Sequence, residues 1–78
     1  MKVKQLAANM TEVELGDFTI LFSYETPVAA HEAGVGVFKT DKKWSATTSK
    51  HINKWMARHG FSKAEEKEQK FFDTLVSL

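Results

Sequence analysis

The 78-residue sequence contains no cysteine, one proline, four glycines and no long hydrophobic run. Without cysteine the chain cannot form a disulfide framework, a Cys-type zinc site or a thiol nucleophile. No apolar stretch approaches the roughly 18 residues of a membrane-spanning helix, and the first 15 residues lack the apolar core of a signal peptide. These absences favour a single cytoplasmic domain, 1–78, near the lower size limit for folding without a disulfide or metal.

The residues that are present are typical of a globular protein, with 42% apolar and 27% charged side chains. The net charge of +1 hides an asymmetry. Residues 1–38 carry two lysines against five acids, and residues 59–78 carry three lysines against four acids. Residues 39–58 carry six basic side chains against one acid, a net charge of +5. Such a cluster attracts phosphates or an acidic protein surface, and a solvated lysine face is the structural alternative.

Alternating apolar and polar residues predict strands in the first half of the chain. The alternation runs through residues 11–15 and again through 18–24, which is the period of a half-buried strand. Gly16-Asp17 between the two runs suits a two-residue hairpin turn. The continuous apolar run Ile20-Leu21-Phe22 indicates a central strand that is partly covered on its second face as well.

The strand pattern continues as far as residue 41. Pro27 lacks an N–H group, so it suits a strand edge, a bulge or a corner. Short strands follow at Val28–His31 and Val35–Thr40, and Val3–Leu6 is either another strand or a frayed edge. We therefore predict an antiparallel β-meander of three to five strands over residues 1–41.

A first helix is predicted over residues 47–60. Ile52, Trp55 and Met56 form an apolar stripe of helical period, with Trp55 as the core anchor. Thr48 is the expected N-cap. Gly60 follows two cationic residues, so it is expected to end the helix in the left-handed conformation, with Phe61 folding back on the last turn.

A second helix is predicted over residues 62–78, because Ser62 and Glu65 have the spacing of a capping box. The predicted fold class is α+β, an antiparallel meander packed against two C-terminal helices. The apolar residues of both helices are expected to cover the sheet face that carries Phe18, Ile20 and Phe22.

Metal binding and catalysis have weak support. His31, His51 and His59 lack the spacing of a zinc motif, and none of the serines lies in a nucleophile elbow. Glu25 and Glu32 flank the proline near other polar groups, but a two-layer domain of this size rarely encloses a catalytic pocket. We therefore expect no metal, no cofactor and no enzymatic activity.

The basic segment is the better candidate for a binding site. On the predicted helix four polar residues lie opposite the apolar stripe: Lys50, Asn53, Lys54 and Arg58. Lys42 and Lys43 come just before, and the hydroxyl residues between can bond phosphate oxygens. Trp44 can stack on a base, although a tryptophan at a helix entry is more often part of a core.

Two stretches, LFSYETPVAAH (residues 21–31) and KKWSATTSKHINKW (residues 42–55), resemble a family of small uncharacterised proteins of bacteriophages, prophages and other mobile elements. The resemblance covers roughly residues 10–56, and the second stretch is its more specific part. It implies a habitat, the host cytoplasm, and carries no known catalytic or binding residues.

Two functions follow as expectations. The first is a nucleic-acid binder that uses the basic helix face, and the second is an interaction protein that binds and modulates a host protein. The sequence pI of about 8.0 is lower than the value above about 9 that is usual for nucleic-acid-binding domains. The acidic first half, in turn, can mimic a nucleic acid, which favours the second function.

Overall fold

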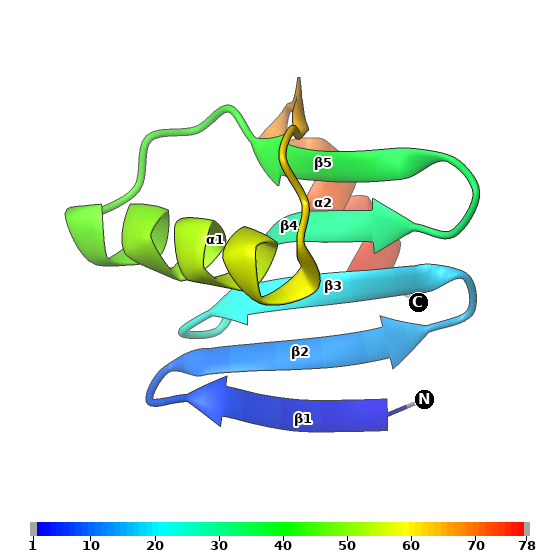
Figure 1. The fold of residues 1–78 in the computed structure, drawn as a ribbon. Coiled ribbons are helices and arrows are strands. Elements are labelled where there is room, and N and C mark those ends of the chain that lie inside the picture. Colours follow the sequence, from blue (N-terminus) through cyan, green and yellow to red (C-terminus); the bar gives the residue numbers. More distant parts are fainter. Residues whose placement is uncertain (1, 78) are drawn as a thin grey trace.

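The computed structural model describes residues 2–77, which form one sheet and two helices (Figure 1). The elements along the chain are β1 (Lys2–Ala7), β2 (Met10–Leu15), β3 (Phe18–Ser23), β4 (Thr26–Glu32), β5 (Gly36–Thr40), α1 (Ala46–His59), β6 (Glu65–Lys67) and α2 (Gln69–Val76). The predicted α+β class is confirmed. Within this range neither helix has the length and apolar character that crossing a membrane requires.

The sheet has six strands in the order of the chain, so the prediction of three to five strands is too low. Strands β1 to β5 form the predicted antiparallel meander. The β2–β3 connection is the predicted two-residue hairpin, and its first residue, Gly16, has the positive φ (62°) of a II′ turn. The additional strand β6 pairs in parallel with β5.

Strand β4 lies in the middle of the sheet although it contains the only proline of the chain. Pro27 has no N–H group to donate to a ladder, and the β3–β4 register shifts beside it, between Leu21 and Phe22. Of the three alternatives expected for Pro27, the register shift agrees with a bulge, and the central place of β4 is against a strand edge. The Pro27 carbonyl accepts a hydrogen bond from the side chain of Gln69 (2.8 Å), which ties α2 to the bulge.

Helix α1 begins one residue before the predicted range, and the prediction of Thr48 as its N-cap is wrong. The N-cap is Ser45, whose hydroxyl accepts a hydrogen bond from the Thr48 N–H (3.3 Å). Thr48 is buried, and its own hydroxyl lies 3.0 Å from that of Ser23. Thr48 therefore makes a tertiary contact in the core, and Ser45 caps the helix instead.

The C-terminal end of α1 follows the prediction. Gly60 has a φ of 76°, and the N–H groups of Gly60 and Phe61 donate to the carbonyls of Ala57 and Met56. This double hydrogen bond is a Schellman motif. It turns Phe61 back onto Trp55, with 5.4 Å between the ring centroids.

The prediction of a second helix over 62–78 is wrong at its start, because α2 begins at Gln69. Glu65–Lys67 forms β6 instead, so the expected capping box lies in a loop and a strand. Pairing with β5 satisfies N–H and C=O groups that the sheet edge would otherwise leave open. The polar residues before Gln69 would gain little from a helix, because such a helix has no apolar face to bury. The last predicted residue, 78, lies outside the described residues.

The two helices lie on opposite faces of the sheet, α1 on the near side and α2 on the far side in Figure 1. The near core consists of Met10, Leu21, Val28, Ala29, Ile52 and Trp55. The far core consists of Ile20, Ala30, Phe38 and Phe72. The expectation that both helices cover one face is therefore wrong. Ile20 and Leu21 point to opposite faces and are both fully buried, so the doubly covered central strand is confirmed.

Candidate functional site

The outer surface of α1 is basic. Four residues of the helix face the sheet: Thr48, His51, Ile52 and Trp55. The opposite side exposes Lys50, Asn53, Lys54 and Arg58. Within residues 2–77 the close contacts between basic and acidic side chains are His59–Glu12 and Lys67–Glu65, so no carboxylate pairs with Lys50, Lys54 or Arg58. Their charge is available to an anionic partner.

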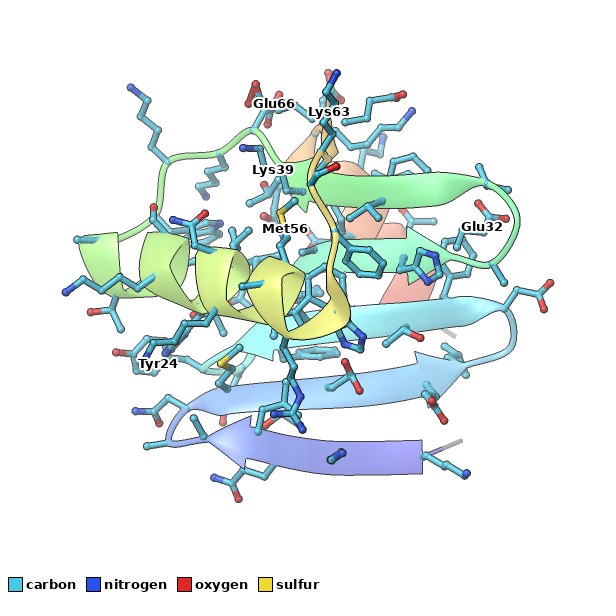
Figure 2. The ribbon with its side chains drawn as sticks, in the orientation of Figure 1. Tyr24, Glu32, Lys39, Met56, Lys63 and Glu66 are labelled. Atoms are coloured by element: carbon cyan, nitrogen blue, oxygen red, sulfur yellow. The ribbon has the colours of Figure 1, made fainter. Side chains whose placement is uncertain are left out.

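A surface groove of about 400 Å³ lies beside the first turns of α1. Its walls are the segment 41–44, the helix itself and the paired edge of β5 and β6. The charged groups that line it are Lys39, Lys42, Lys43, Asp41 and Glu66. Figure 2 shows Lys39 and Glu66 together at the strand edge, where their Cα atoms are partners in the β5–β6 ladder.

Trp44 lies in this groove and is held at its edge. Its indole Nε1 donates to Gln69 Oε1 (3.2 Å), and Gln69 is itself bound to the Pro27 carbonyl. The ring is 38% exposed, and the ammonium of Lys42 lies 4.2 Å from its centroid, which is a cation–π contact. Trp44 is therefore a positioned surface ring and lies outside both cores.

The residues expected at the site fall into two adjoining parts. Lys42, Lys43, Trp44 and Asn53 line the groove. Lys50, Lys54 and Arg58 are exposed along the helix but do not line it. We call the following six residues the basic surface: Lys42, Lys43, Lys50, Asn53, Lys54 and Arg58. Gln69, which accepts the hydrogen bond from the Trp44 indole, is not predicted from the sequence, because nothing in the sequence indicates that α2 reaches the loop before α1.

A serine and a histidine meet under α1 without forming a catalytic pair. Ser23 Oγ lies 2.7 Å from His51 Nδ1, but the two residues are only 2% and 8% exposed. A nucleophile must be reached by its substrate, and Ser23 is closed off by the helix. The contact satisfies buried polar groups instead.

The other histidines also have structural contacts. His59 Nε2 lies 2.5 Å from Glu12 Oε1, which also accepts a hydrogen bond from Trp55 Nε1 (2.9 Å). His31 packs on Phe61, with 4.8 Å between ring centroids. Among residues 2–77, no three His, Asp or Glu side chains are grouped so as to hold a metal ion.

Fold and surface together define a small mixed-sheet domain with one helix on each face and an unpaired basic surface on the near helix. The chain belongs to a family of unknown function (DUF8033), whose match covers residues 1–74. The match thus extends beyond the stretch 10–56 and includes β6 and most of α2. No curated protein and no solved structure matches the chain.

Proposed function

We propose that the protein is a non-enzymatic binder of nucleic acid and that the basic surface contacts the phosphate backbone. The observation that supports this proposal is the row of cations along α1, which is exposed and free of carboxylate partners within residues 2–77. The apolar side of the same helix is committed to the near core. These side chains therefore contribute charge with little contribution to packing, as phosphate contacts require.

The salt dependence of binding to mixed-sequence DNA tests this function. If three or four cations meet phosphates on a duplex, log K should fall against log salt with a slope of about −3. Lys50→Ala and Lys54→Ala should each weaken binding on all sequences alike and reduce the slope by about one. Lys70→Ala, an exposed lysine on α2 at the far face, is the matched control and should change neither quantity. Absence of binding at about 50 mM salt, where counterion release favours even weak contacts, rules the function out.

A protein partner is the second candidate, in which the chain binds and modulates a host protein. The observation that favours it is an exposed apolar side chain on the far face, where α2 packs on β4 and leaves β1 uncovered. Val3 of β1 is 64% exposed and pairs with Val13 across the ladder. This function predicts no binding of DNA at low salt and capture of a host protein that substitutions at the contact surface abolish.

The resemblance of residues 21–31 and 42–55 to phage and mobile-element proteins supports a related proposal about origin. A phage-encoded chain would work in the host cytoplasm, where both nucleic acid and host proteins are accessible. Genes for phage structural or replication proteins beside the gene for this chain would support that origin.

A further inference from the structure

Two exposed aromatic rings lie beside the basic helix. Among the described residues the large hydrophobic side chains that are exposed are Val3, Tyr24, Val35 and Trp44. The two aromatic members of this set, Tyr24 (52% exposed) and Trp44 (38% exposed), both adjoin α1. The two valines lie on the edge strand and at the β4–β5 turn, away from that helix.

The rings flank α1 on its two sides. Trp44 shares the groove with Ser49 and Asn53, on the side of the helix that faces β5. The ring of Tyr24 lies 5.9 Å from that of His51, on the side that faces β3, and Figure 2 shows it below the first half of the helix. The exposed row that includes Lys50 and Lys54 runs between them.

The backbone at Tyr24 is unusual for so large a residue. Tyr24 and Glu25 form the two-residue turn between β3 and β4, and Tyr24 has a φ of 59°. The first position of such a turn is normally glycine, because a side chain in the left-handed region is strained. Gly16 occupies the equivalent position in the β2–β3 turn. Strain of this kind concentrates at functional sites, and here the strained residue presents an exposed ring beside α1.

We propose that the nucleic acid bound is single-stranded, with bases stacked on Trp44 and Tyr24 and phosphates on the cations of α1. This inference rests on the proposed function and specifies its substrate class. Basic tracks combined with exposed aromatic rings are the usual means of binding single strands, because every unpaired base offers a face for stacking. In a duplex those faces are covered by neighbouring base pairs, so a duplex on α1 would leave both rings without a stacking partner.

The groove beside Trp44 carries charges of both signs. It is lined by Asp41 and Glu66 together with Lys39, Lys42 and Lys43. A base stacked on Trp44 can therefore lie in the groove while the neighbouring phosphates contact Lys42, Lys43 and the cations of α1. Lys42, which covers the indole in the free protein, has a long side chain that can move from the ring to a neighbouring phosphate when a base stacks.

The test compares oligonucleotides of about 12 nucleotides, within the site sizes of single-strand binders, as single-stranded DNA, single-stranded RNA and duplex DNA at one salt concentration. Fluorescence anisotropy should show tighter binding of single strands than of the duplex. Trp44→Ala and Tyr24→Gly should each weaken single-strand binding by about 5- to 150-fold, the loss of one stacked base, and leave duplex binding unchanged. Val35→Ala, at a more exposed apolar residue in the β4–β5 turn, is the control and should bind like the wild type.

Two further readouts separate stacking from unfolding. Tyr24→Gly relieves the strained turn, so a loss of binding with an undiminished melting temperature cannot come from a damaged fold. Single strands should quench the fluorescence of the wild type, and this quenching should disappear in Trp44→Phe, which retains only the buried Trp55. A preference for RNA or for DNA would identify the sugar and support the proposal in either case.

The outcomes distinguish the inference from the function on which it rests. Duplex and single strands bound equally, with no effect of the two aromatic substitutions, would overturn the inference while the backbone-binding function stands. No binding of any oligonucleotide at about 50 mM salt would overturn both.

Discussion

At the scale of single residues, the near face of the sheet buries polar groups that satisfy one another. Glu12 is 8% exposed and accepts hydrogen bonds from Trp55 and His59. Ser23 lies within hydrogen-bonding distance of Thr48 and His51. No buried side-chain nitrogen or oxygen within residues 2–77 lacks a partner. Since an unpaired buried polar group costs about 1–3 kcal/mol, these contacts fix how α1 sits on the sheet.

Tyr24 is the residue at which stability and function are expected to conflict. Tyr24→Gly should raise the free energy of unfolding by about 0.5–1 kcal/mol, because glycine adopts a positive φ without strain. Urea denaturation measures the change. Glu25→Gly is the matched control in the same turn. Glu25 has no positive φ, so glycine there only adds freedom to the unfolded chain and should destabilise. A loss of stability in Tyr24→Gly would show that the ring stabilises the fold.

At the scale of elements, α1 and α2 begin for different physical reasons. The start of α1 is capped by a side chain, whereas Glu68 at the start of α2 makes no side-chain cap hydrogen bond. α2 is positioned by tertiary contacts instead: Gln69 bridges the Pro27 carbonyl and the indole of Trp44, and Phe72 is fully buried. A short helix of this kind depends on packing more than on its own propensity.

Two serines test this account of the helix starts. Ser45→Ala should lower the free energy of unfolding by about 1 kcal/mol, because it removes the N-cap of α1. Ser62→Ala should change it by less than about 0.5 kcal/mol, as for surface substitutions generally, because Ser62 is exposed and precedes no helix. The two variants serve as controls for each other in urea denaturation. A larger loss of stability in Ser62→Ala than in Ser45→Ala would instead support the capping box that the sequence predicts.

At the scale of the whole molecule, the sheet carries two separate cores, one on each face. Each face of the meander is apolar, so each needs a covering helix. The chain passes from one face to the other at the β5 edge, where β6 pairs before α2 begins. The basic surface lies on the near helix, while the far helix covers the other core.

Removing the anchor of either core should destabilise the whole molecule. Trp55 and Phe72 are both 0% exposed and lie on opposite faces. Trp55→Ala and Phe72→Ala should each cost about 3–5 kcal/mol, a large part of the roughly 5–10 kcal/mol available to a domain of this size. In each variant the amide signals of α1 and α2 should disappear at the same urea concentration. Loss of α2 alone in Phe72→Ala would show that the two faces unfold independently.

The sequence by itself determined the features that depend on neighbours along the chain. The period of residues 11–24 predicts β2 and β3, Gly16-Asp17 predicts their turn, and Gly60 predicts the end of α1. The row that includes Lys50 and Lys54 follows from the same reasoning, because residues four apart share one side of a helix. Those lysines are exposed because the apolar stripe on the other side of the same helix faces the core.

The tertiary structure decided what depends on contacts between distant segments. Glu12 is buried under α1 beside Trp55 of the near core, although strand alternation places it on the polar side. The polar residues 65–67, which belong to the capping-box pattern, pair with the open edge of β5 as β6. Helix α2 therefore starts later and packs on the far face. The groove and the positions of Trp44 and Tyr24 beside α1 likewise arise from elements that meet only in the folded chain. The physical reason is that local pattern sets which side of an element is apolar, whereas the partner of that side is chosen by packing of the whole chain.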